Sequence, residues 1–209
     1  MGPVIGFDLD MTLIDPRLGI RRIMRFLSQA TGIHVDGARL AENLGPPLED
    51  ALHAHGLSAQ QVRTVVDRYR ADYLEHVVPE TVAMPGAAES LAAVRELGGR
   101  VVVVTGKHRP SAALHLAAFG WEVDHLAGGV FGVGKAAVLT EHGVGLYVGD
   151  HVADVLGARA AGARAVAVAS GPCSAAELAA AGADVVLPDL SGLPALLREM
   201  TSPPAAPAR

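Results

Sequence analysis

The sequence predicts an α/β fold with an open parallel sheet, and two observations carry the prediction. Short apolar runs rich in β-branched residues recur along the chain, and helical patterns lie between them. One stretch, residues 16–80, breaks this alternation because it contains helical patterns and no good strand. With 209 residues, half of them hydrophobic, the chain is long enough for one such domain carrying a modest insert. We therefore expect a Rossmann-like parallel sheet with an inserted α-helical domain.

The expected strands are short and apolar at successive positions. A half-exposed sheet would show alternating polar and apolar residues, so both faces of this sheet are expected to be covered. The strands are Val4–Phe7, Val101–Val104, Gly145–Val148, Ala165–Val168 and Asp184–Leu187, with a weaker candidate at Glu122–Leu126.

The helical patterns alternate with these strands, which is typical of helices packed on both faces of a parallel sheet. They are Ala87–Leu97, Ser111–Phe119, Lys135–His142, Ala153–Ala161 and Ser174–Ala181.

The helical insert, residues 16–80, contains two clear helix patterns. Arg17–Ala30 is amphipathic, and its candidate apolar positions are Leu18, Ile20, Ile23, Met24 and Leu27. Ser58–Val77 begins with a plausible N-cap, Ser58, and has Gln61 three residues later. We expect residues 1–15 and 81–200 to form the α/β core, and the Pro- and Ala-rich residues 201–209 to form a disordered tail.

Composition excludes several classes of protein. The formal net charge is −5, which argues against a general nucleic-acid-binding surface. The single cysteine, Cys173, excludes an internal disulfide framework and a cysteine-based zinc site. No apolar run approaches the roughly 20 residues of a membrane-spanning helix, and the N-terminus lacks a signal-peptide pattern. We expect a cytoplasmic protein without a membrane or nucleic-acid partner.

Two carboxylates follow the first expected strand, at Asp8 and Asp10, and Thr12 comes next in the same alternation. Two neighbouring carboxylates at the end of a buried strand are costly unless they form ion pairs, bind a metal or serve a function. Ligands of open α/β sheets collect at the carboxyl ends of strands where the strand order reverses. The alternative is that both are ordinary turn residues, but this spacing directly after an apolar strand favours a functional site.

Polar residues also follow two later strands. Thr105, Gly106 and Lys107 follow one, and Asp150 follows another, with Asp154 four residues on at the start of a helix. Four aspartates meeting at one edge of the sheet would repel each other. A hard divalent cation would relieve this repulsion, and Mg²⁺ typically takes a few carboxylates together with waters and a phosphate.

These motifs resemble, in order and spacing, the four motifs of the haloacid dehalogenase superfamily. The residues that carry the resemblance are Asp8–Thr12, Thr105, Lys135 and Gly149–Asp154. The helical insert looks like that superfamily's helical cap. The segments Leu44–Leu48 and Met84–Gly86 look most like its phosphoglycolate phosphatase-like branch. The similarity covers nearly the whole chain apart from the tail.

The resemblance implies a Mg²⁺-dependent phosphatase acting on a small phosphorylated metabolite. Asp8 would be the nucleophile that forms an aspartyl phosphate, and Asp10 would protonate the leaving oxygen and then help to activate water. Lys135 would balance the negative charge, and Thr105 with the Gly106 amide would hold phosphate oxygens. Lys107 and His151 are further candidates for substrate contact.

The metal ligands implied by the resemblance are the Asp8 carboxylate, the Asp10 carbonyl and Asp150, with Asp154 as a further ligand or an orienting group. The chain also departs from the usual motifs. Met11 replaces the usual glycine, Ala136 follows Lys135 where proline is common, and His151 stands where a small hydroxyl residue is common. These departures leave every expected catalytic group in place but leave the substrate open.

Three other functions stay open. Gly129–Lys135 matches most of a P-loop, which would indicate a nucleotide-binding ATPase or kinase, but Ala136 occupies the position of the metal-binding Ser or Thr. A phosphomutase would use the same two aspartates to return the phosphoryl group to a sugar. A non-catalytic binding protein could keep the fold alone. The sequence does not predict an oligomeric state.

Overall fold

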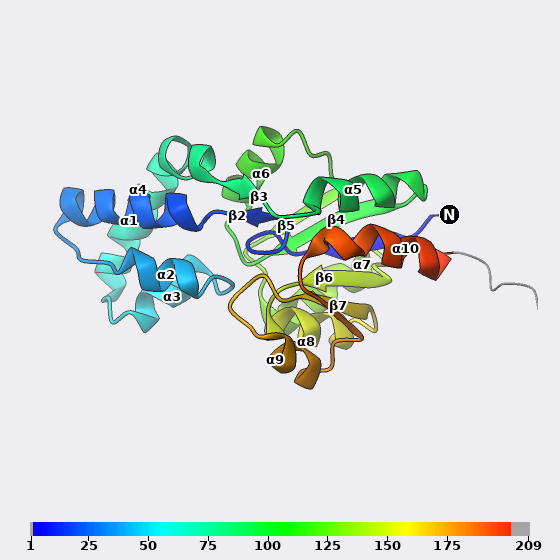
Figure 1. Ribbon diagram of the computed structural model, residues 1–209. Coiled ribbons are helices and arrows are strands. Elements are labelled where there is room, and N and C mark those ends of the chain that lie inside the picture. Colours follow the sequence, from blue (N-terminus) through cyan, green and yellow to red (C-terminus); the bar gives the residue numbers. More distant parts are fainter. Residues whose placement is uncertain (1, 202–209) are drawn as a thin grey trace, which may run out of the picture.

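The computed structural model describes residues 2–201, with the side chain of Thr201 not described. The chain forms an α/β core with a group of helices set to one side of it (Figure 1). The tail expected at residues 201–209 lies outside the described residues, apart from the backbone of Thr201 at the end of the last helix.

The core is a six-stranded sheet in which every neighbouring pair of strands is parallel, as the sequence predicts. The order places β1 between β4 and β6, so the direction of winding reverses at β1, where ligands of such sheets collect. From one edge to the other, the strands are β5 (His125–Gly128), β4 (Arg100–Thr105), β1 (Val4–Phe7), β6 (Leu146–Gly149), β7 (Arg164–Val168) and β8 (Val185–Leu187).

Helices cover both faces of the sheet, which explains why the strands are apolar at successive positions. In β4, Val101 and Val103 face one hydrophobic core, while Val102 and Val104 face the other. The helices on the first face are α5 (Ala87–Glu96), α6 (Arg109–Ala118) and α10 (Leu193–Thr201), with the short helix η3 (Leu190–Gly192). Those on the second face are α7 (Lys135–Glu141), α8 (Val152–Ala160) and α9 (Ala175–Ala180), with η2 (Gly132–Gly134) at the start of α7.

The helical insert leaves the core through β2 (Ile14–Asp15) and returns through β3 (Val82–Ala83), which pair antiparallel. It has its own cluster of buried hydrophobic residues. Leu114 of α6, which belongs to the α/β core, packs against this cluster. The insert contains α1 (Arg17–Thr31), α2 (Gly37–Glu42), α3 (Leu48–Ala54), α4 (Ala59–His76) and η1 (Val78–Glu80).

Local sequence patterns predicted the longer helices well. Ser58 and Gln61 form the expected reciprocal cap at the start of α4. Four of the five apolar positions expected in α1 are buried, but the assignment of Leu18 to the buried face is wrong because that residue is 60% exposed. The two-residue strands β2 and β3 and the short helices α2 and α3 carry too little pattern to be predicted, and α10 was not predicted either.

The weak strand expected at Glu122–Leu126 begins three residues later and spans His125–Gly128. The reason is local, because the Asp124 carboxylate accepts the Val101 backbone N–H at 2.7 Å. Pairing with β4 therefore begins only at His125, which is opposite Val102.

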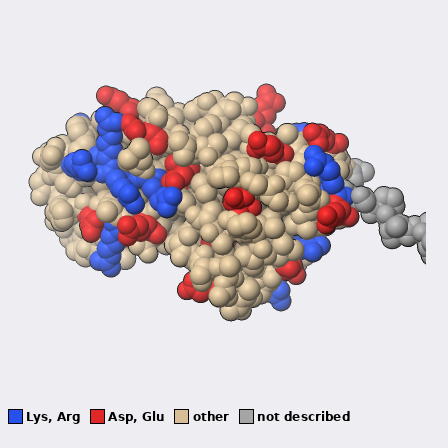
Figure 2. Space-filling model, in the orientation of Figure 1, with Lys and Arg blue, Asp and Glu red and all other residues tan. Residues whose placement is uncertain are grey.

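The surface carries both signs of charge. On the face shown in Figure 2, Lys and Arg gather over the helical insert with Asp and Glu among them, and no large single-sign area forms. Among the described residues, no helix combines the length and the apolarity needed to cross a membrane.

Candidate active site

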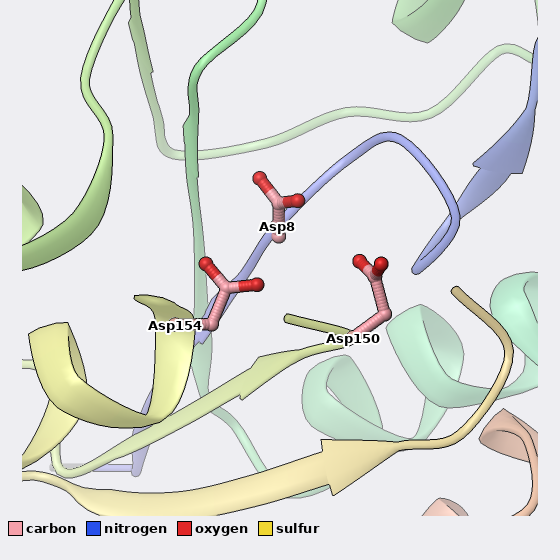
Figure 3. Close-up of side chains that lie close together, drawn as sticks. All are labelled: Asp8, Asp150 and Asp154. Atoms are coloured by element: carbon pink, nitrogen blue, oxygen red, sulfur yellow. The ribbon is translucent and has the colours of Figure 1, made fainter. Parts of the chain in front are cut away.

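Three buried aspartates meet at the carboxyl edge of the sheet. Asp8 follows β1, Asp150 follows β6, and Asp154 lies in the first turn of α8. Each offers a carboxylate oxygen, and these oxygens lie within 4.8 Å of one another (Figure 3). We call Asp8, Asp150 and Asp154 the aspartate centre. The strand order brings together residues that lie more than 140 positions apart in the sequence.

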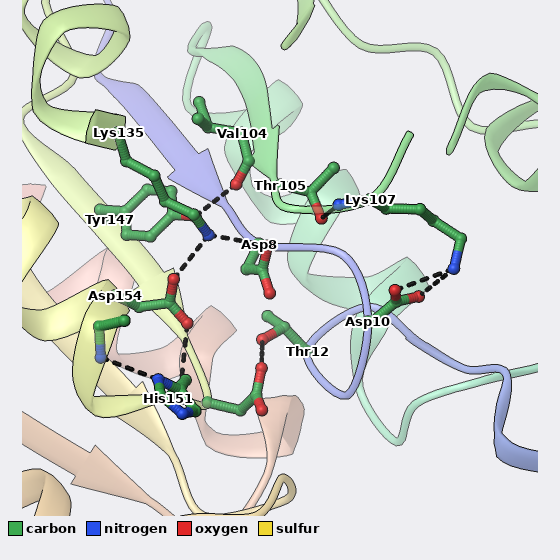
Figure 4. A network of polar contacts seen from close by, with 12 residues as sticks. Asp8, Asp10, Thr12, Val104, Thr105, Lys107, Lys135, Tyr147, His151 and Asp154 are labelled. Atoms are coloured by element: carbon green, nitrogen blue, oxygen red, sulfur yellow. Dashed lines mark hydrogen bonds and ion pairs between the residues drawn. The ribbon is translucent and has the colours of Figure 1, made fainter. Parts of the chain in front are cut away.

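Lys135 is the cation of this centre. Its Nζ donates to Asp8 Oδ1 at 2.9 Å, to Asp154 Oδ1 at 2.6 Å and to Tyr147 Oη at 2.8 Å, so all three of its N–H groups have an acceptor (Figure 4). The side chain is 1% exposed. Burial alone would lower the Lys135 pKa, but Asp154 and Asp8 reverse this and raise it well above its usual range. Lys135 is therefore a fixed, permanently charged group.

Tyr147 is a member of the site that the sequence analysis missed. Its hydroxyl accepts from Lys135 and donates to the Val104 carbonyl at 2.6 Å, which links β6 to β4 beneath Asp8. Gly6 of β1 makes room for the ring, since a Cβ there would lie 2.6 Å from Tyr147 Cδ2. The available signal was a hydroxyl in an otherwise apolar buried strand, because such a group needs a partner.

Asp150 is the least compensated member of the aspartate centre. Thr12 donates to its Oδ1 at 2.8 Å, but none of the described residues forms an ion pair with it. Burial, together with Asp8 and Asp154, raises the Asp150 pKa well above its usual range. Three buried carboxylates against one lysine leave an excess of negative charge on oxygen ligands, and this donor set fits a hard divalent cation such as Mg²⁺.

Asp154 is already engaged on both oxygens. One accepts from Lys135, and the other accepts the His151 backbone N–H at 3.1 Å. Close packing fixes the carboxylate further, because a Cβ at Gly149 would lie 2.5 Å from it. In this arrangement the first task of Asp154 is to hold Lys135 in place.

The Asp10 side chain does not join the aspartate centre. Both of its oxygens accept from Lys107 Nζ at 2.9 Å, and the pair is largely buried. Burial raises the Asp10 pKa, although Lys107 works in the opposite direction. Lys107 Nζ also lies 5.3 Å from the ring centroid of Tyr73, which comes from α4 of the helical insert. The Tyr73 hydroxyl forms a 2.6 Å hydrogen bond with His115 Nε2 on α6.

The remaining predicted site residues lie around these groups. Thr105 is buried, and its hydroxyl accepts the Lys107 backbone N–H at 3.2 Å. Gly106 lies so close to the helical insert that a Cβ there would be 2.4 Å from the Gly45 carbonyl oxygen. His151 Nδ1 accepts the Ala153 backbone N–H and caps α8, so its substrate contact stays a prediction.

Met11, which departs from the family's glycine, has a φ of 60° and is the one non-glycine residue with positive φ in the described chain. Its side chain is 2% exposed. The Ser170 hydroxyl donates to its carbonyl at 2.7 Å. The turn thus keeps a conformation that favours glycine, with packing and one hydrogen bond holding a bulkier residue in it.

The P-loop interpretation of Gly129–Lys135 is disfavoured by this geometry. A P-loop lysine must reach nucleotide phosphates. Every N–H of Lys135 Nζ instead points to an internal acceptor in a buried site.

Curated relatives of the chain are phosphatases and a kinase. It is 29% identical to a phosphoglycolate phosphatase of Caulobacter vibrioides over 98% of this chain and 94% of that protein. It is 31% identical to a 5′-nucleotidase of Pseudomonas aeruginosa over 85% of this chain and 87% of that protein. It is also 35% identical to the tyrosine-protein kinase PtkA of Mycobacterium tuberculosis, but the match spans only 57% of this chain and 41% of that protein.

Solved structures share the whole fold. A predicted phosphatase from Clostridium acetobutylicum superposes with a TM-score of 0.80 at 23% identity, covering 95% of this chain and 99% of that one. The family model of the haloacid dehalogenase-like hydrolases matches residues 5–159, which include the aspartate centre, Lys135 and the helical insert. The resemblance inferred from the motifs is confirmed: the chain belongs to the haloacid dehalogenase-like hydrolase family.

Proposed function

We propose that this chain, a phosphoric monoester hydrolase of the haloacid dehalogenase-like family, uses Mg²⁺ and a transiently phosphorylated Asp8 to hydrolyse a small phosphorylated metabolite. One observation carries the proposal. Lys135 holds Asp8 Oδ1, whereas no described residue donates a hydrogen bond to Asp8 Oδ2. A carboxylate fixed by one oxygen with the other open is suited to attack phosphorus.

The side chains of the site divide the work as follows. Asp8 Oδ2 forms the new bond to phosphorus while the bond to the leaving oxygen breaks, and that oxygen takes a proton from Asp10. Water then attacks the phosphorus, gives its proton to Asp10 and releases Asp8 with inorganic phosphate.

Asp8, Asp150 and the Asp10 carbonyl are the groups that would hold Mg²⁺, which when bound supplies positive charge to the phosphoryl oxygens. Lys135 supplies a positive charge at Asp8 Oδ1, and Asp154 and Tyr147 hold its ammonium in place. Thr105 and the Gly106 amide are the proposed contacts to phosphate oxygens.

The proposal is tested with a panel of phosphate monoesters, assayed with and without Mg²⁺, for the wild type and Asp8→Asn. The substitution keeps the shape of the side chain and removes the nucleophile. We expect phosphate release from the wild type only with Mg²⁺, and a loss of at least about 10³-fold in kcat for the variant. Unchanged turnover by Asp8→Asn would refute the mechanism.

A second candidate is transfer of the phosphoryl group from Asp8 to an alcohol instead of water, as in a phosphomutase or a kinase. The partial similarity to the tyrosine-protein kinase PtkA is the reason to consider this transfer. Phosphate release decides between the two, because a hydrolase releases one inorganic phosphate for each ester consumed, while a transferase produces a new ester.

A further inference from the structure

A cavity of about 580 Å³ lies between the helical insert and the core. Asp10, Gly106 and Lys107 line its core side, while Asp8 and Asp150 do not line it. Asp10 thus lies at the boundary between the aspartate centre and this cavity. In the proposed reaction Asp10 protonates the leaving oxygen, so the organic group attached to that oxygen would occupy the cavity. A volume of this size is in the range that holds drug-sized molecules and far exceeds the need of a two-carbon group.

The charges that line the cavity balance each other. They are the carboxylates Asp10, Glu49 and Asp50 and the cations Arg70, Lys107 and Arg109. Two of the cations are engaged in ion pairs inside the set, Lys107 with Asp10 at 2.9 Å and Arg70 with Glu49 at 2.5 Å. The third, Arg109, donates from Nε to the Leu126 carbonyl.

A negatively charged leaving group would gain little in such a cavity. Its carboxylate would compete with Asp10 for Lys107 or with Glu49 for Arg70, and it would meet the exposed Asp50, so that only the exposed Arg109 lies outside these ion pairs. His108 adds no firm positive charge, because burial and Arg70 lower its pKa. The cavity therefore favours a leaving group without charge.

The wall contributed by α4 is aromatic. Tyr69 and Tyr73 lie four residues apart on one face of the helix, with ring centroids 5.2 Å apart, and both are at least nine-tenths buried. Tyr73 is fixed by His115 and Lys107, which makes this wall rigid. Pro46, Pro47, Ile20 and Leu40 add further apolar surface to the same cavity. Rigid aromatic and prolyl surfaces pack well against a flat ring.

We propose that the leaving group is a neutral alcohol bearing a planar ring, so that the substrate is a nucleoside 5′-monophosphate and not the phosphate of a small hydroxy acid. This inference rests on the proposed phosphatase function and deepens it. The ring packs along the Tyr69 face, and the ribose hydroxyl attached to phosphorus lies next to Asp10.

Three substrates separate the contributions of charge and ring. The full-length protein with Mg²⁺ is assayed for phosphate release from uridine 5′-monophosphate, ribose 5-phosphate and 2-phosphoglycolate. We expect kcat/KM to fall in that order, with at least about a tenfold difference between the first and the last. A kcat/KM for 2-phosphoglycolate equal to or above that for the nucleotide would overturn the inference and leave the phosphatase function standing. Release from none of the three and from no other monoester would instead contradict the phosphatase function, whereas release from other monoesters alone would overturn only the inference about the substrate.

A pair of variants tests the aromatic wall itself. Tyr69→Leu removes the ring, and Tyr69→Phe keeps it and removes only the hydroxyl. We expect Tyr69→Leu to lower the ratio of kcat/KM for uridine 5′-monophosphate to that for ribose 5-phosphate by about fivefold, and Tyr69→Phe to keep the ratio within twofold. An unchanged ratio in a folded Tyr69→Leu would overturn the role of the ring. Should that variant fail to fold, the comparison of substrates on the wild type still decides.

Discussion

The aspartate centre and the cavity beyond Asp10 lie side by side but are built differently. The centre consists of residues at strand ends and at the start of α8, and four hydrogen bonds to their carboxylates hold it, one to Asp8, one to Asp150 and two to Asp154. The cavity is lined on one side by helix faces and a loop of the helical insert, and on the other by core residues that include Asp10, Gly106 and Lys107. The difference teaches that sheet topology places the proposed catalytic groups, whereas the proposed substrate cavity depends on how the helical insert meets the core.

Replacing Lys135 by arginine should give the largest effect on activity, and the substitution changes only the aspartate centre. The ammonium has three acceptors arranged around one point, while a guanidinium is planar and larger and finds no space at a site that is 1% exposed. We expect kcat to fall about 100-fold despite the conserved charge, measured by phosphate release. A variant within twofold of the wild type would show that geometry at Lys135 is unimportant.

Replacing Asp150 by asparagine should distinguish the electrostatic repulsion among the three buried carboxylates from the role of Asp150 as a metal ligand. The change removes a buried charge that has no cationic partner among the described residues, so without Mg²⁺ the melting temperature should stay level or rise. At a Mg²⁺ concentration about 100 times Kd, the wild type should gain about 2.7 kcal/mol and the variant far less. Calorimetry with and without Mg²⁺ measures both. An equal gain in the two proteins would exclude Asp150 as a ligand.

The same chemical change made in each region sharpens the comparison. Tyr147→Phe removes the hydroxyl between Lys135 and the Val104 carbonyl, and Tyr73→Phe removes the one that meets His115. Each should cost about 1–3 kcal/mol of unfolding free energy, because buried polar groups lose their partner. Steady-state kinetics should show a lower kcat for Tyr147→Phe and mainly a higher KM for Tyr73→Phe. Equal effects on kcat would remove the distinction between the two regions.

The last prediction concerns pH and the contact between α4 and α6, and it involves no change in catalysis. Burial, aided by Lys107, lowers the His115 pKa from 6.5 to about 3, so His115 stays neutral in the folded protein where the unfolded chain binds a proton. Its contribution to stability is complete above pH 6.5 and is lost as pH falls toward 3. Urea unfolding from pH 6.5 to 4 should therefore show a slope at most about 1.4 kcal/mol per pH unit steeper for the wild type than for His115→Gln. Parallel curves would contradict the assignment.

The sequence predicted the residues of the aspartate centre better than the contacts around the cavity, for physical reasons. Asp8 and Asp150 directly follow strands with strong local patterns, and a parallel sheet must bring these two strand ends together, while Lys135 begins a predicted helix. Tyr147 went unrecognised because its hydroxyl lies inside an apolar strand, where only tertiary packing reveals its partners. The Tyr73–His115 contact depends on how α4 meets α6, which no local pattern encodes.

The nucleophile is the central claim, and chemical trapping tests it most directly. The wild type is quenched during turnover and treated with borohydride, which reduces an aspartyl phosphate to homoserine, and the peptides are then read by mass spectrometry. The account predicts homoserine at position 8 and at no other aspartate. Homoserine at Asp10 or Asp150, or an unmodified Asp8 in an enzyme that accumulates a hydroxylamine-labile phosphoprotein, would contradict it.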